Sequence, residues 1–337
     1  MARKSQPSPK RKSTRRPLRV LWIPGLGADQ RMYEPLTRAL EKDDSFQWDH
    51  HFVTYPQDAR DLAEVRSLED LASLTLQSVI ETIGARDKSS KSAAGKKGPR
   101  IEGATQSQSK KSGQKSKALT FDLIVGVSMG GMIAQILVGQ NRIFTRNLAL
   151  ISTAYSGEDL RGPFRQFSWL PAALPGPVRR GMQWSIGKAY PFFRPNVREA
   201  RKFAAMFLEF PQKIFFEAPR WIRNWNGEAG LQASLALPTM PADTNGVRLF
   251  RLHGTGDPLL SYERITRRIK IDRSFPGEGH IVFATRADTI ARELIEMLQV
   301  SVKGGSRKAA RSQRNASSRG QWTAKKSRKK RSGPSRK

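Results

Sequence analysis

The sequence of 337 residues contains no cysteine. This absence excludes disulfide bonds, thiolate metal sites and a cysteine nucleophile, and it is compatible with a reducing compartment. The sequence also lacks any run of about 18 apolar residues, the length that a helix needs to span a bilayer. We therefore expect no transmembrane segment.

The N-terminal region lacks most features of an export signal. Ser13-Thr14-Arg15-Arg16 precedes an apolar stretch, an order that a twin-arginine signal also shows. However, the apolar stretch is short, is interrupted by Arg19 and lacks an Ala-x-Ala cleavage site. It is better explained as the first strand of a core, and we predict a cytoplasmic protein.

Acidic residues are scarce in three parts of the chain, and these parts carry nearly all of the net charge of +31. Residues 1–17 have seven basic and no acidic residues, 86–117 have ten and two, and 303–337 have fourteen and none. Such segments contain too few apolar residues to bury a core. We predict disordered basic tails at 1–17 and 303–337, a disordered basic insert at 86–117, and one folded domain over 18–302.

Strand-like and helix-like patterns alternate along that domain. Continuous apolar runs typical of buried parallel strands are interleaved with apolar residues at helical spacing. This alternation predicts an α/β fold with a mostly parallel central sheet and helices on both faces. The expected strands are 18–23, 46–55, 119–127, 147–152, 247–253 and 270–275, and the expected helices are 30–42, a segment after Ser67, 129–138, 263–268 and 286–300.

Residues 155–235 interrupt the alternation. They are rich in aromatic residues and contain several prolines and arginines. We predict that they form a helical cap inserted into the one sheet-based domain. The aromatic side chains suit an apolar ligand pocket; alternatively, they only pack the interior of the cap.

One serine lies where an expected strand turns sharply into an expected helix, in the sequence Gly-Val-Ser-Met-Gly at 126–130. At such a turn a serine adopts a strained backbone conformation that lifts its hydroxyl clear of the sheet. Gly126 and Gly130 lack the side chains that would otherwise collide there. The context predicts a nucleophile elbow with Ser128 as the nucleophile.

A serine hydroxyl needs a base to take its proton, and the base needs a third group to orient it. Asp257 follows one expected strand, and His280 lies in a glycine-rich loop between the last strand and the last helix. Alone, each of them is explained as a structural residue. Because they follow Ser128 in the order acid and then base, each after a strand, we predict a catalytic triad of Ser128, Asp257 and His280.

With these residues, the sequence resembles the α/β-hydrolase superfamily over 18–85 and 118–300. Its loop Pro-Gly-Leu-Gly-Ala-Asp at 24–29 is similar to the oxyanion loop of small bacterial members. The resemblance implies that the backbone N–H groups of Leu26 and Met129 form the oxyanion hole, which agrees with one donor following the nucleophile. At position 24 this sequence has proline, where many members have histidine.

The sequence offers few groups for a metal or cofactor. It contains four histidines and shows neither a multi-ligand metal spacing nor a phosphate-cradling loop. His50 and His51 beside Asp49 leave a metal site open as an alternative, and His253 is expected to be structural. We predict no cofactor and no metal.

We therefore expect a serine hydrolase that cleaves a small-molecule carboxylic ester or thioester with an apolar group, by acyl transfer. The basic tails allow an alternative from another class. A nucleic acid or an anionic membrane would attract them without sequence specificity, and the chain would then be a tethered polyanion-binding protein in which the hydrolase fold is secondary. A third interpretation is that the tails are merely solvated.

Overall fold

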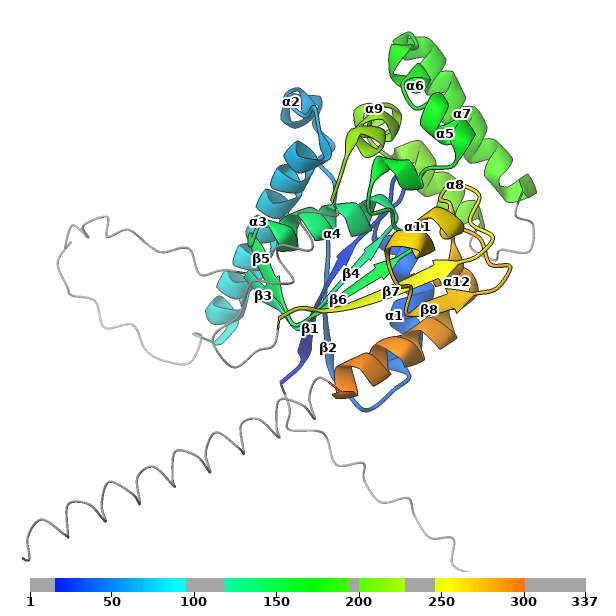
Figure 1. The fold of residues 1–337 in the computed structure, drawn as a ribbon. Helices are drawn as coiled ribbons and strands as arrows, with labels where there is room; N and C mark the ends of the chain where they lie inside the picture. The colour runs from blue at the N-terminus through cyan, green and yellow to red at the C-terminus, as the bar shows by residue number, and fades with distance from the viewer. Residues whose placement is uncertain (1–15, 95–118, 194–199, 228–245, 301–337) are drawn as a thin grey trace, which may run out of the picture.

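The computed structural model describes residues 16–94, 119–193, 200–227 and 246–300 (Figure 1). The two predicted tails, except Arg16 and Pro17, and most of the predicted basic insert lie outside these residues. Their contact with polyanions and the cytoplasmic location of the chain stay predictions. Within the described residues, no helix is both long and apolar enough to cross a bilayer.

The described residues form an α/β fold around a six-stranded sheet, as the sequence predicts. All neighbouring strands pair in parallel, in the order β2-β1-β4-β6-β7-β8. The two central strands, β4 and β6, are completely buried, which explains their continuous apolar sequences. The strand bounds are β1 Leu18–Ile23, β2 Trp48–Phe52, β4 Leu123–Val127, β6 Asn147–Ile151, β7 Arg248–Gly254 and β8 Arg273–Phe275.

Helices cover both faces of the sheet (Figure 1). Helices α3 (Leu68–Ala94) and α4 (Met129–Gly139) pack on one face. Helix α1 (Glu34–Glu41) and the C-terminal helix at 287–300 pack on the other. Shorter elements complete the domain: η1 Gln30–Tyr33, α2 Ala59–Leu62, α11 Tyr262–Arg268 and α12 Val282–Thr285.

The apolar run before the serine turn, predicted as one strand, consists of two strands in different sheets. β3 (Leu119–Phe121) pairs with β5 (Ile143–Thr145), whereas β4 joins the central sheet. The break falls at Asp122. Its carboxylate accepts the backbone N–H of Arg19 at 2.9 Å and both guanidinium nitrogens of Arg16 at 2.7 and 2.6 Å. Asp122 therefore fixes the start of β4 against β1.

Helix α3 begins where the sequence predicts, because the Ser67 hydroxyl accepts the N–H of Asp70 at 3.1 Å. It ends later than expected, at Ala94, and so extends into the segment for which disorder is predicted. Residues 86–94 contain neither glycine nor proline, so nothing in their backbone chemistry opposes helix. High charge alone is a poor guide to where a helix ends.

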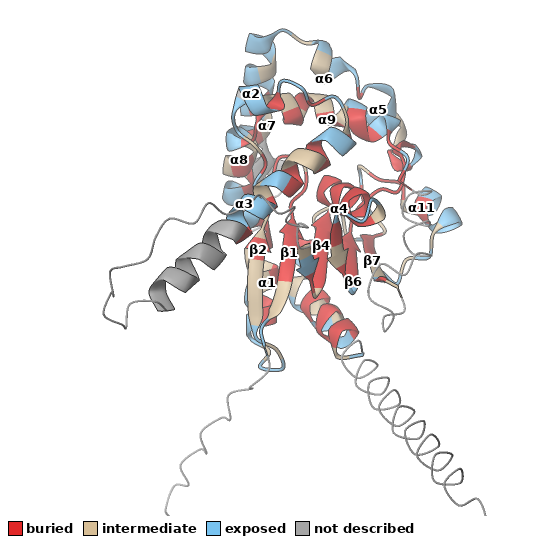
Figure 2. Cartoon of the chain, turned by 90° about the vertical axis from the view of Figure 1, so that its left-hand side faces the viewer, coloured by how far each residue is buried: buried red, intermediate tan, exposed pale blue. Residues whose placement is uncertain are grey.

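The segment between β6 and β7 forms a helical insert that lies beyond the carboxyl ends of the strands (Figures 1 and 2). Its two ends are joined, because the Gly157 N–H donates to the Trp225 carbonyl at 2.8 Å and the Gly227 N–H donates to the Tyr155 carbonyl at 3.1 Å. The insert comprises η2 Gly157–Asp159, α5 Gly162–Gln166, α6 Leu170–Ala173, α7 Gly176–Phe193, α8 Ala200–Glu209 and α9 Gln212–Asn224.

The role of Asp122 gives a first prediction. Asp122→Ala removes the acceptor of three hydrogen bonds and should lower the free energy of unfolding by about 1–3 kcal/mol. Asp288→Ala is the matched control, because Asp288 makes only an exposed ion pair with Lys42 and its loss should cost less than about 1 kcal/mol. Urea denaturation of both variants measures the difference, and equal effects would contradict the role given to Asp122.

Candidate active site

The turn from β4 into α4 holds Ser128 in an uncommon backbone conformation, with φ 53° and ψ −123°. A residue with a side chain is strained at this positive φ, and the surrounding structure has to hold it there. The Ser128 N–H donates to the Ile151 carbonyl at 3.0 Å, and the Ser128 carbonyl accepts the Thr153 hydroxyl at 2.6 Å. These bonds, from the last residue of β6 and from Thr153 just beyond it, fix the turn.

Glycines on either side of Ser128 allow the helix to approach the sheet closely. A Cβ atom on Gly130 would lie 2.0 Å from the Ile23 carbonyl oxygen of β1, and one on Gly126 would lie 2.5 Å from the Gly131 Cα. Both separations are shorter than any van der Waals contact. The structure therefore gives the physical reason for both glycines of the predicted elbow.

Three side chains from distant parts of the chain meet at this turn. The Nε2 atom of His280 lies 2.9 Å from the Ser128 hydroxyl oxygen, and its Nδ1 atom lies 2.7 Å from Asp257 Oδ2. Asp257 is fully buried, while the His280 side chain is 16% exposed. The three predicted residues thus form one hydrogen-bonded chain that ends on the hydroxyl of Ser128.

The Asp257 carboxylate is surrounded by donors. Oδ1 accepts the backbone N–H groups of Leu259 at 2.8 Å and Leu260 at 3.0 Å, and the His253 ring nitrogen Nε2 lies 3.3 Å from Oδ2. Burial raises the pKa of Asp257, but the charge and hydrogen bond of His280 and the nearby ring of His253 lower it by more. The net result is a pKa well below the ordinary value, so Asp257 stays ionised and holds His280 by its Nδ1–H.

The loop after β1 lies against the serine. A Cβ atom on Gly25 would lie 3.2 Å from the Cβ of Ser128. Within the described residues, neither the Leu26 N–H nor the Met129 N–H donates a hydrogen bond. Neither N–H group is therefore committed to a protein acceptor among these residues. The loop is anchored at Pro24 although no histidine stands there, because the Tyr55 hydroxyl donates to the Pro24 carbonyl at 2.6 Å.

Aromatic side chains of the helical insert border this loop. Gly27 has φ 75°, and a Cβ atom on it would lie 2.3 Å from the Phe207 ring and 3.2 Å from the Phe215 ring. The rings of Phe207 and Phe215 meet edge to face, with centroids 6.0 Å apart. Beyond them, Phe203 contacts Phe283 of α12. The insert thus contacts both the loop after β1 and the segment that follows the histidine loop.

Three residues outside the predicted triad support the site. Thr153 fixes the Ser128 carbonyl, as described above. Arg161, at the start of the insert, donates its Nε–H to the Asp257 carbonyl at 2.8 Å. His253, expected to be structural, lies against the Asp257 carboxylate. Only His253 has a signal in the sequence, because it lies at the end of strand β7, four residues before Asp257.

The remaining histidines have structural partners. His50 accepts the indole N–H of Trp22 at 3.0 Å, and His51 lies 2.9 Å from an Asp49 carboxylate oxygen. In the described part of the chain, no group of three or more histidine and carboxylate residues is arranged to hold a metal ion. A metal site at His50 and His51 gains no support from this arrangement.

Comparison with known proteins agrees with the fold. A sequence model of the alpha/beta hydrolase family matches residues 20–293, and the chain belongs to this family. It is an enzyme of the hydrolase type. The predicted fold class and family resemblance are thereby confirmed. No curated protein matches the chain in sequence.

Solved structures show the same fold at low sequence identity. A carboxylesterase from Nitrososphaera gargenis is 15% identical with a TM-score of 0.55, over 86% of this chain and 92% of that one. A thermophilic esterase from Thermogutta terrifontis is 15% identical with a TM-score of 0.53, over 84% and 89%. A hydrolase from Oleispira antarctica is 15% identical with a TM-score of 0.54, over 84% and 91%.

The close approach at the elbow predicts a strong effect of one methyl group. Gly130→Ala places a Cβ on backbone atoms of β1 and should destabilise the fold by about 1–3 kcal/mol or more. Gly181→Ala is the control, because no atom lies within 4 Å of the added Cβ and alanine favours helix. Thermal denaturation of both variants tests this, and a Gly130→Ala protein as stable as the parent would show that the turn is not tightly packed.

The lowered pKa of Asp257 predicts a pH-dependent contribution to stability. Below the ordinary pKa of 3.8, the unfolded chain binds a proton on this carboxylate that the folded chain does not. Proton binding then stabilises the unfolded state relative to the folded state. The contribution is therefore fully present above that pH and is lost as the pH falls through the lower pKa of the folded state. Chemical denaturation of the parent and Asp257→Asn should show a stability difference that shrinks below pH 3.8, and a constant difference would contradict it.

Proposed function

We propose that this chain is a serine hydrolase that cleaves a small-molecule carboxylic ester or thioester with an apolar group. The observation that carries the proposal is the hydrogen-bonded chain from Ser128 through His280 to Asp257. It supports the arrangement of nucleophile, base and orienting acid that acyl transfer requires. The two backbone N–H groups beside the serine support it further, because they are suited to an oxyanion.

In the first step, His280 Nε2 takes the proton of the Ser128 hydroxyl as its oxygen attacks the carbonyl carbon of the substrate. The carbonyl oxygen becomes an oxyanion, which the backbone N–H groups of Leu26 and Met129 stabilise. Asp257 keeps the proton on Nδ1 of His280 and stabilises the imidazolium. When the tetrahedral intermediate collapses, the imidazolium donates its proton to the leaving alcohol or thiol.

In the second step, water replaces the leaving group. His280 takes a proton from the water molecule, whose oxygen attacks the ester that Ser128 now carries. The same two N–H groups stabilise the second oxyanion. Its collapse breaks the bond to Ser128 and releases a carboxylic acid, and His280 returns the proton to the serine oxygen. The enzyme is then restored.

The helical insert supports an apolar acyl group. Phe207 and Phe215 lie against the loop that supplies one oxyanion donor. An acyl chain on Ser128 therefore lies next to aromatic rings. We assign the insert the role of a cap over the site, whose aromatic side chains both pack its own interior and border the substrate. Apolar lining with a few directed polar groups is typical of small-molecule sites.

The proposal predicts that Ser128→Ala abolishes turnover of short p-nitrophenyl esters. Removal of a triad nucleophile costs on the order of 10⁴–10⁶ in kcat. Ser152→Ala is a matched control, because Ser152 also has a positive φ, 44°, and within the described residues its buried hydroxyl has no hydrogen-bond partner. A fluorophosphonate label should map to Ser128 by mass spectrometry. Undiminished turnover in Ser128→Ala, or label on another residue, would reject the proposal.

The cap assignment predicts a chain-length effect. Phe207→Ala removes apolar surface from the acyl side of the site and should raise KM for a hexanoyl ester by about three- to tenfold, with a smaller change for an acetyl ester. Phe164→Ala removes an equal side chain that is half exposed on the outside of the insert and should leave both KM values unchanged. Equal changes for the two esters in Phe207→Ala would place the acyl chain elsewhere.

A further inference from the structure

The outer side of the helical insert exposes large apolar side chains. Ten such side chains are exposed among the described residues, and seven of them lie between Phe164 and Trp184, in α5, in α6 and in the first half of α7 or beside them. Phe167 and Trp184 are 57% and 56% exposed. Figure 1 shows α6 and the adjoining end of α7 projecting far from the sheet, and much of this surface is exposed in Figure 2. So concentrated an apolar surface indicates a contact partner.

The same segment carries only positive charge. Residues 161–188 contain five basic residues and no acidic residue. In the described part of the chain, none of these five has a carboxylate within 4.0 Å, the limit for an ion pair. Lys188 instead lies over the ring of Trp184, 5.7 Å from its centroid. A surface that combines unpaired cations with tryptophan and phenylalanine is typical of segments that bind at a membrane interface.

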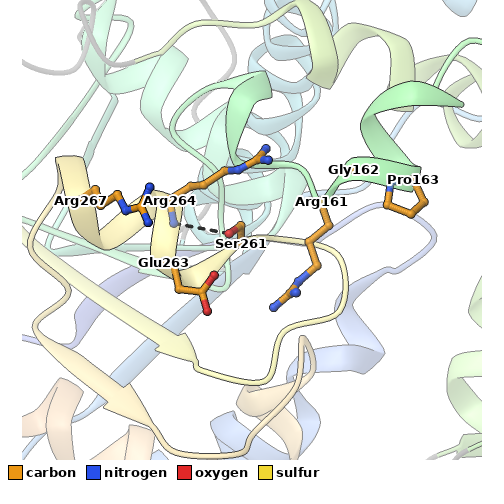
Figure 3. Close-up of a pocket in the computed structure, with 7 residues that line it drawn as sticks. All are labelled: Arg161, Gly162, Pro163, Ser261, Glu263, Arg264 and Arg267. Atoms are coloured by element: carbon orange, nitrogen blue, oxygen red, sulfur yellow. Dashed lines mark hydrogen bonds between the residues drawn. The ribbon is translucent and has the colours of Figure 1, made fainter.

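Arginines also line two adjoining cavities beside the start of α5. The smaller cavity, about 340 Å³, contains Arg161, Arg267 and Glu263 (Figure 3). The Arg264 guanidinium is held by the carbonyls of Glu158 at 3.0 Å and Leu160 at 3.3 Å. The larger cavity, about 520 Å³, has no acidic residue and is lined by Gly162, Arg165, Gln166, Arg223, Asn224 and Arg264.

We propose that the outer face of the helical insert binds an anionic lipid bilayer, with the larger arginine-lined cavity receiving headgroup phosphates. The apolar side chains of α5–α7 enter the interfacial region of the bilayer, where burial of their surface is favourable. Arginine suits phosphate oxygens because its planar guanidinium donates two parallel hydrogen bonds. This face is part of the folded domain and is distinct from the basic tails.

Two other occupants fit this face less well. A second copy of the chain would bring the same cations face to face, and like charges repel. A single-stranded nucleic acid would stack its bases on aromatic rings. Such stacking does not involve exposed aliphatic side chains such as Leu170, Val178 and Met182. A lipid bilayer matches both the charge and the aliphatic character.

The test uses the full-length chain carrying Ser128→Ala, so that the result does not depend on hydrolysis. Sedimentation with phosphatidylcholine vesicles, with and without phosphatidylglycerol, gives the partition coefficients. At high salt the attraction of the tails is screened, whereas the apolar contact persists. The double substitution Phe167→Ser and Trp184→Ser should then lower partitioning onto phosphatidylglycerol vesicles by at least about tenfold.

The double substitution Arg165→Gln and Arg223→Gln should reduce the preference for phosphatidylglycerol, measured as the ratio of the partition coefficients with and without this lipid. Ile80→Ser, an exposed apolar residue on α3, and Arg60→Gln, an exposed arginine on α2, are the matched controls and should change neither quantity. Unchanged melting temperatures confirm that the variants fold.

The proposal is overturned if the insert variants partition like the parent, because the tails would then carry all binding. It is equally overturned if the apolar substitutions instead abolish a dimer in the absence of vesicles, or weaken binding to single-stranded DNA while leaving vesicle binding intact.

Discussion

Helix α4 lies so close to β1 that no side chain fits between them at position 130. This steric constraint fixes where the helix begins, and the position of the helix in turn forces the chain through a positive φ at Ser128. The strained turn persists because hydrogen bonds from β6 and the Thr153 hydroxyl hold it on its other side. This single approach of helix to strand sets the orientation of the serine oxygen and its distance to the loop after β1. It also places the N–H of Met129, which has no acceptor among the described residues.

Asp257 connects this centre to the helical insert. Its carboxylate is anchored by backbone N–H groups of its own loop, and its carbonyl accepts the guanidinium of Arg161 at the start of the insert. Leu160 and Leu260 pair across an antiparallel bridge, and the Ser261 N–H donates to the Asp159 carbonyl. The loop that carries Asp257 is therefore built jointly by the sheet domain and the first residues of the insert, so a shift of the insert changes the surroundings of Asp257.

The sequence predicts those features that depend on local chemistry. The sharp turn at Ser128 and the parallel core can be predicted, because glycine spacing indicates backbone conformation and apolar runs indicate burial. The break at Asp122 is not visible, because its cause is a hydrogen bond to Arg19, far away in the sequence, and an apolar run does not say which neighbouring strand it joins. The support from Thr153 and Arg161 was missed for the same reason, since a side-chain bond to a distant carbonyl leaves no local pattern.

The closure of the insert at its two ends has a consequence for how such an enzyme changes. Gly157 and Trp225 lie side by side, and a Cβ on Gly157 would lie 1.8 Å from the Arg223 carbonyl oxygen, so the start of the insert and the end of its described part meet at nearly one point. Between these points the insert contacts the sheet domain through side chains such as Arg161, which donates to the Asp257 carbonyl, and Phe207, which lies against Gly27. An insert of different shape would therefore keep the surroundings of Asp257 only if it also supplied these contacts, so the chemistry and the choice of substrate are linked where the insert begins.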